Sequence, residues 1–136
     1  FYLSFNESID ITNKIVGGNL YNIVSKKLIN HYNSTGDLIN YIKLSHLLQL
    51  DISEIDLKNL LINIIDKKYY KNNFYIKNQI YNYIDFYFIN LLNYKKAKKK
   101  IYIFYDYFIK KIYYLKKFNL DDESFFIELK TKILNG

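Results

Sequence analysis

The chain has no cysteine, proline, methionine, tryptophan or arginine among its 136 residues. Without cysteine it can form no disulfide bond, and it offers neither a thiol nucleophile nor a thiolate ligand for zinc. The lack of proline and the presence of only four glycines leave no segment with the composition of a flexible linker. Because methionine is also missing, we expect Phe1 to be an internal or processed end of a longer protein.

Long apolar runs are missing as well. No run approaches the roughly 18 residues that a membrane-spanning helix needs. The first residues do not have the layout of a signal peptide, so we interpret the sequon Asn33-Ser34-Thr35 as unmodified. We therefore expect an intracellular protein of the cytoplasm or nucleus, with an organelle as the alternative.

Apolar and basic residues dominate what is present. Half of the residues are apolar and 19% are aromatic, enough for the chain to form a core. The abundant Asn, Ile, Lys, Tyr and Phe are encoded by AT-rich codons, which indicates an AT-rich genome. Residues 95–117 hold nine lysines against Asp106 alone, so the net charge of +7 belongs to this segment.

The apolar spacing predicts a mainly α fold. Residues 1–18 have the least clear pattern: residues 1–5 could form a short strand or the tail of a preceding helix, and Gly17-Gly18 ends either one. A helix is predicted from Asn19 to Tyr32, and residues 33–37 stop it, with Asp37 capping the next helix. The apolar positions of this predicted helix recur at helical spacing, and they are Leu20, Ile23, Val24, Leu28 and Tyr32.

Two further helices are predicted before a change of pattern. One covers residues 38–50, with a break near Tyr41-Ile42 as an option. The other runs to about Lys68, because Asp51 and Glu54 have the spacing of a capping box, with Ser53 and Asp56 as a competing cap.

From residue 74 to 86, aromatic and β-branched residues alternate with polar ones, which is typical of strands. Lys71-Asn72-Asn73 indicates a turn, and Lys77-Asn78-Gln79 forms a plausible hairpin tip. A helix over 79–93, giving a plain helical bundle, is the alternative. The predicted fold is therefore mainly α, with a helical segment at 1–36, a winged-helix module of three helices and a small β-hairpin at 37–90, and C-terminal helices at 91–136.

A long amphipathic helix follows at 94–117, where apolar residues recur at spacings of three and four. At 1.5 Å per residue it is roughly 36 Å long. Its apolar seam either folds onto its own domain or enters a bundle with helices of partner proteins. A last helix is predicted after the caps at Asp121-Asp122. The residues of the seam are Tyr94, Ala97, Ile101, Phe104, Phe108, Ile112 and Leu115.

Residues 41–48 (YIKLSHLL) and 50–68 (LDISEIDLKNLLINIIDKK) resemble the winged-helix half of a PCI domain. The resemblance covers about residues 37–86. That family supplies scaffold subunits of the proteasome lid, the signalosome and the translation initiation factor 3 complex, in which a long C-terminal helix often joins a helical bundle. The resemblance thus implies a scaffold subunit whose winged helix and segment 94–117 dock onto other subunits.

The charge of the predicted recognition helix also favours protein docking over DNA binding. Its first turn, residues 51–56, carries three carboxylates that would face phosphates. Without arginine the chain has no bidentate contact to guanine. We predict a non-catalytic scaffold subunit that contacts partner proteins through the seam.

An RNA-associated protein, ribosomal or organellar-ribosomal, is the alternative function. The basic segment would neutralise phosphates, and its tyrosines would stack on bases. The candidate contacts are the lysines Lys95, Lys96, Lys98, Lys99 and Lys100, with tyrosines Tyr102, Tyr105, Tyr107, Tyr113 and Tyr114 nearby. Amphipathic tyrosines and solvated lysines that cover apolar neighbours would give the same composition.

The sequence indicates no catalytic, cofactor or metal site. His31 and His46 are 15 residues apart with no third ligand at metal spacing. Ser45 adjoins His46, but neighbouring residues on a helix do not face each other. Glycine-rich phosphate loops are absent too. We therefore predict no enzyme activity, no cofactor, no metal and no small-molecule substrate.

Overall fold

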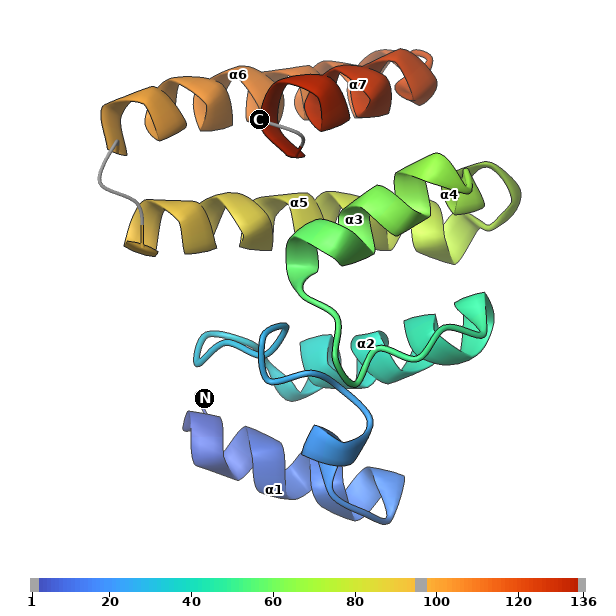
Figure 1. The fold of residues 1–136 in the computed structure, drawn as a ribbon, viewed down its shortest axis with the longest axis vertical. Coiled ribbons are helices and arrows are strands. Elements are labelled where there is room, and N and C mark those ends of the chain that lie inside the picture. The colour runs from blue at the N-terminus through green and yellow to red at the C-terminus, as the bar shows by residue number, and fades with distance from the viewer. Residues whose placement is uncertain (1–2, 95–97, 135–136) are drawn as a thin grey trace. The chain divides into compact units, whose positions relative to one another are not determined.

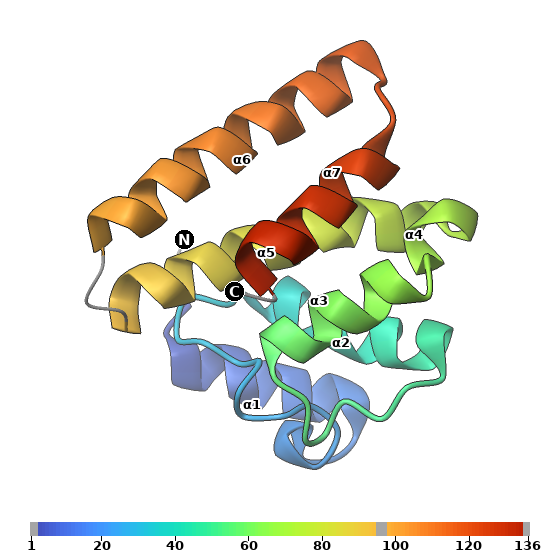
Figure 2. The same ribbon diagram turned by 45° about the horizontal axis from the view of Figure 1, so that its top comes forward.

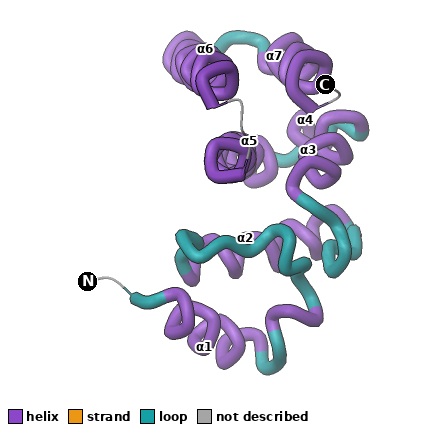
Figure 3. The backbone as a smooth tube through the Cα atoms, turned by 60° about the vertical axis from the view of Figure 1, so that its left-hand side comes forward, coloured by secondary structure: helices purple, strands orange, loops and turns teal. Residues whose placement is uncertain are grey.

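The computed structural model describes residues 3–94 and 98–134, and all regular structure within these residues is helical (Figure 1). Figure 3 shows helices and loops, and no strand in the described part of the chain. The predicted mainly α class is confirmed. The chain divides into two compact units, Phe1–Leu60 and Leu61–Gly136, and the division falls within helix α3 (Leu57–Asp66). The predicted segments 1–36, 37–90 and 91–136 stay a prediction.

Helix α1 (Phe5–Val16) begins at the last residue of the segment 1–5, where a strand or the tail of a preceding helix was predicted. It begins with a reciprocal capping box, in which the Ser4 N–H donates to Glu7 Oε2 at 2.8 Å and the Glu7 N–H donates to Ser4 Oγ at 3.2 Å. It ends at Gly17, as expected, because a φ of +72° is the left-handed conformation that glycine adopts without strain.

The helix predicted from Asn19 to Tyr32 is wrong. Only the single 3₁₀ turn η1 (Leu20–Asn22) forms there. Beyond this turn the backbone finds partners outside a helical ladder, since the Ser25 N–H donates to the Ile52 carbonyl at 2.8 Å and the Lys27 N–H donates to Ser25 Oγ at 3.1 Å. Of the five apolar positions, Leu20, Val24 and Leu28 are still buried, because turns can also direct side chains inward, and Ile23 and Tyr32 are partly exposed.

Helix α2 (Thr35–Leu48) is continuous through Tyr41-Ile42. Its start is a second capping box, in which Ser34 is the cap and Asp37 is its partner three residues later, rather than the cap itself. Helices α1 and α2 contact each other within the first unit. The buried residues of α1 are Ser8, Ile9 and Thr12, and the Thr12 hydroxyl donates to the Ser8 carbonyl at 2.7 Å.

Helix α3 begins later than predicted. Asp56 Oδ1 accepts the Asn59 N–H at 2.8 Å and so caps the first turn. The predicted cap Asp51 instead accepts the Ser53 N–H at 2.9 Å inside the preceding loop. Asp51 and Asp56 could both cap this helix, and the cap is formed by Asp56, which lies nearer the apolar residues of α3.

The predicted hairpin is wrong, and with it the winged-helix form over the described residues. After the short helix α4 (Tyr69–Asn72), helix α5 runs unbroken over Phe74–Tyr94. The buried residues of α5 recur mainly in steps of four, which a strand also places on one face, so the period is ambiguous. The helical alternative of a bundle without a wing agrees with the structure. The buried residues in steps of four are Ile76, Ile80, Ile84 and Phe88.

The second unit is completed by α6 (Lys98–Phe118), α7 (Asp122–Leu129) and the π-helical turn η2 (Lys130–Leu134). The cap of α7 is Asp121, as expected, because its carboxylate accepts the Glu123 N–H at 3.2 Å. Helix α6 contacts both α5 and α7, and Figure 2 shows α7 returning beside it. No described helix is both long and apolar enough to cross a lipid bilayer.

Candidate functional site

The central residues of the predicted seam face the interior of their own unit. Phe108 is fully buried, with ring centroids 6.0 Å from Phe88 on α5 and 5.7 Å from Phe125 on α7. Ile112 is buried as well. Both residues therefore stabilise the second unit and are not free to bind a partner while it is folded.

The other seam residues are only partly covered. Ile101, Phe104 and Leu115 are half-buried, and their contact with a partner protein stays a prediction. Ala97 and the candidate contacts Lys95 and Lys96 lie outside the described residues, as does the side chain of Tyr94.

Two of the candidate tyrosines are engaged within the unit. The Tyr105 hydroxyl donates to Asp85, and its ring stacks on Phe88 with centroids 5.3 Å apart. Burial, together with the hydrogen bond to Asp85, raises the pKa of Tyr105 to about 12. The Tyr107 hydroxyl donates to Glu128 Oε1 at 2.5 Å. These two residues hold α6 against its neighbours.

Two glutamates of α7 form ion pairs with lysines of neighbouring segments. Glu128 pairs with Lys111 at 2.7 Å and Lys132 at 3.2 Å. Glu123 pairs with Lys68 at 2.8 Å and Lys71 at 2.7 Å. The hydrogen bonds from Lys111 and Tyr107 lower the pKa of Glu128 to about 2, and those from Lys68 and Lys71 do the same for Glu123. These lysines are therefore neutralised by neighbouring carboxylates.

Most of the lysines on α6 have no such neutralisation. Lys110 pairs with Asp106 at 2.9 Å, and Lys111 pairs with Glu128. The remaining lysines of the helix have no carboxylate within ion-pair distance among the described residues, and all of them are exposed. They are Lys98, Lys99, Lys100, Lys116 and Lys117.

Exposed aromatic rings lie beside the C-terminal lysines of α6. Tyr113, Tyr114 and Phe118 are 57%, 51% and 57% exposed. Tyr114 and Phe118 stack with centroids 6.0 Å apart and planes inclined by 12°, while Tyr113 meets Tyr114 edge-on at 5.5 Å. Lys117 Nζ lies 5.5 Å from the Tyr113 ring and 5.4 Å from the Phe118 ring. We name these four residues the Lys117 cluster; Tyr102 is another exposed ring of α6.

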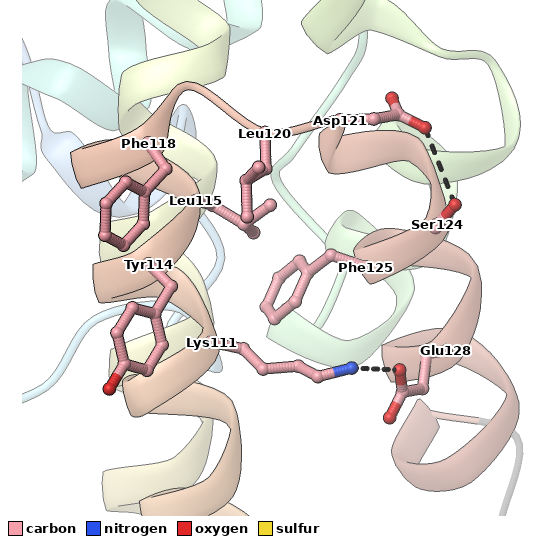
Figure 4. Close-up of a pocket in the computed structure, with 9 residues that line it drawn as sticks. All are labelled: Lys111, Tyr114, Leu115, Phe118, Leu120, Asp121, Ser124, Phe125 and Glu128. Carbon is pink, nitrogen blue, oxygen red and sulfur yellow. Dashed lines mark hydrogen bonds and ion pairs between the residues drawn. The ribbon is translucent and has the colours of Figure 1, made fainter.

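An apolar groove of about 460 Å³ opens between α6 and α7 (Figure 4). The side chains of Tyr114 and Phe118 form its α6 wall, and Phe125 reaches into it from α7. The Lys111–Glu128 ion pair crosses one end of it, and the Asp121–Ser124 contact lies toward the other. Sequence reasoning missed this groove. The remaining lining residues are Leu115 and Leu120.

The histidines do not form a site. His31 and His46 are exposed, and the described residues contain no group of three or more potential ligands that could hold a metal ion. The Ser45 hydroxyl donates to the Leu50 carbonyl at 2.7 Å and so caps the local turn.

Comparison of the chain with family models, curated proteins and solved structures finds no match. The resemblance to the PCI family therefore stays a prediction, and the wing that formed part of it is missing from the described residues. A function must be inferred from the chemistry of the α6 surface.

Proposed function

We propose that this chain is a non-catalytic RNA-binding module and that the exposed face of α6 contacts the RNA. The observation that carries the proposal is the set of five α6 lysines without a carboxylate partner, on a helix that also exposes tyrosines. Lysines neutralise phosphates and release counterions, which is the main source of affinity for RNA. A basic stripe along one helix is the expected electrostatic footprint.

The position of these lysines favours a ligand over simple solvation. Lys98, Lys99 and Lys100 begin α6, where the helix dipole makes positive charge unfavourable. Their mutual repulsion adds to this cost, because no described carboxylate lies within ion-pair distance of them. Elsewhere in the same unit lysines such as Lys71 and Lys130 pair with Glu123 and Asp66. A polyanion would relieve the repulsion on α6.

The test is the binding of fluorescein-labelled (U)₁₂ RNA at increasing KCl concentration. Replacing Lys98, Lys99, Lys100, Lys116 and Lys117 by glutamine should weaken binding and reduce the slope of log K against log[KCl]. Each phosphate contact on a single strand contributes about 0.7 to that slope, so we expect a reduction of roughly 2 to 3.5.

A matched control removes the same charge from the first unit, where Lys14, Lys26, Lys27, Lys43 and Lys58 are exposed. This variant should keep the slope of the original protein. Equal losses in the two variants, or no binding of (U)₁₂ at 20 mM KCl, would contradict the proposal. Tighter binding of (dT)₁₂ would contradict RNA as the ligand.

The predicted scaffold function is a second candidate, because the groove between α6 and α7 is mostly apolar. Phe118 and Leu120 expose more than half of their surface there, which is typical of interfaces. Its occupant would be an amphipathic helix of another protein, with acidic residues facing Lys117, which has no carboxylate within ion-pair distance among the described residues. In a purified complex, Leu120→Asp should release the partner and Ile127→Asp, on an exposed position outside the groove, should not. A complex of unchanged mass with Leu120→Asp argues against this candidate.

A further inference from the structure

We infer, building on the proposed RNA-binding function, that the Lys117 cluster stacks on unpaired bases and makes α6 selective for single-stranded over double-stranded RNA. Three large rings of the cluster are more than half exposed within two turns of one helix. Exposed aromatic surface is unfavourable in water, and a base can cover it. The cluster thus offers ring faces and an ammonium group in one place.

The geometry of the cluster suits stacking. Tyr114 and Phe118 already lie nearly parallel, with planes inclined by 12°, so a base placed against either ring continues the stack. Lys117 Nζ lies 5.5 Å from the ring centroid of Tyr113 and 5.4 Å from that of Phe118. A lysine in this position can contact the phosphate that follows a stacked base.

The paired bases of double-stranded RNA cannot stack on such rings. Its bases are stacked on each other and paired, and proteins recognise it by phosphates, 2′-hydroxyls and groove shape. Unpaired bases expose a π-face whatever their identity, so stacking on tyrosine or phenylalanine is tolerant of sequence. The selectivity should therefore concern strandedness and not sequence.

The other tyrosines near α6 are unsuited to this role. Tyr105 is stacked on Phe88 and bonded to Asp85, and the Tyr107 hydroxyl is bonded to Glu128. Tyr81 is buried beneath Lys116, whose Nζ lies 4.8 Å from its ring centroid. The free rings are thus concentrated at the C-terminal end of α6, with Tyr102 near its start. The stretch from Lys99 to Lys117 is roughly 27 Å long, which suits a site of several nucleotides.

The experiment compares (U)₁₂ with a 12-base-pair RNA duplex, using the protein and a variant carrying Tyr113→Ala, Tyr114→Ala and Phe118→Ala. We expect the original protein to prefer (U)₁₂, and the variant to lose about tenfold or more of its affinity for (U)₁₂ while its affinity for the duplex changes little. The salt slope should stay the same, because no charge is removed. A double variant with Tyr113→Phe and Tyr114→Phe keeps the rings and should keep the affinity.

The control variant carries Ile15→Ala, Leu47→Ala and Phe74→Ala, which removes comparable exposed apolar surface elsewhere and should bind (U)₁₂ normally. Equal binding of strand and duplex by the original protein would overturn the stacking inference and leave RNA binding intact. An alanine variant that is folded by circular dichroism and binds (U)₁₂ normally would also overturn it. Binding to phosphatidylserine vesicles without binding to either RNA would overturn the RNA-binding function itself.

Discussion

Replacing Phe126 by alanine should lower the free energy of unfolding of the second unit by roughly 3–5 kcal/mol. Phe126 is fully buried and lies at the centre of an aromatic cluster. Its ring centroid is 4.5 Å from that of Tyr70, 5.8 Å from that of Tyr81 and 5.4 Å from that of Phe125. Three rigid rings cannot collapse into the space that the missing ring leaves, so most of the cavity would persist.

Urea unfolding followed by far-ultraviolet circular dichroism measures this loss. The neighbouring residue provides the control, because Ile127 is 56% exposed and Ile127→Ala should change stability by less than about 0.5 kcal/mol. A loss below about 1 kcal/mol for Phe126→Ala would mean that α7 is not held against α4 and α5 by this ring. The same logic applies to Phe108→Asp, which should unfold the unit and not merely release a partner.

Replacing Asn82 by proline should cost about 3 kcal/mol or more. Asn82 is exposed in the middle of α5, so the change disturbs the backbone and little else. Proline has no N–H to donate along the helix, and its ring meets the carbonyl of Asn78, four residues earlier. This loss should be comparable to that of a large core truncation.

The companion substitution Asn82→Ala tests whether this segment is a helix or a strand. Alanine is the best helix former, so in α5 this substitution should be neutral or stabilise by a few tenths of a kcal/mol. In a strand of the predicted hairpin it would destabilise, because alanine is depleted there. Thermal unfolding of both variants measures the two effects, and stabilisation by proline at position 82 would exclude a continuous α5.

Local signals in the sequence predicted those parts of the fold that depend on near neighbours. Gly17 ends α1, and Asp121 caps α7, because caps and left-handed turns involve residues within one helical turn. The hairpin was wrong because Ile76, Ile80 and Ile84 share a face under either period. Only the partners that bury this face decide between them, and those partners come from elsewhere in the chain.

In the candidate site, too, the sequence predicted local features but not the contacts between distant parts of the chain. The predicted seam from Ile101 to Leu115 lies on α6, but Tyr94, predicted to begin the same helix, instead ends α5. The sequence did not show that Phe88 and Phe125 would cover Phe108. The basic character of this segment is evident in the sequence, whereas the lack of carboxylate partners for its described lysines is visible only in the structure. The groove was missed because Leu120 follows the end of α6, where Asn119 turns the chain with a φ of +50°.

The two glutamates of α7 make the second unit sensitive to strong acid. In the unfolded chain each would take up its proton near pH 4.5, but the lysines around it lower its pKa to about 2 in the folded unit. Their contribution to stability is therefore complete above about pH 4.5, and it declines as the pH falls toward 2. The ion pairs of Glu123 and Glu128 with their lysines therefore persist throughout the neutral range and are lost only in strong acid.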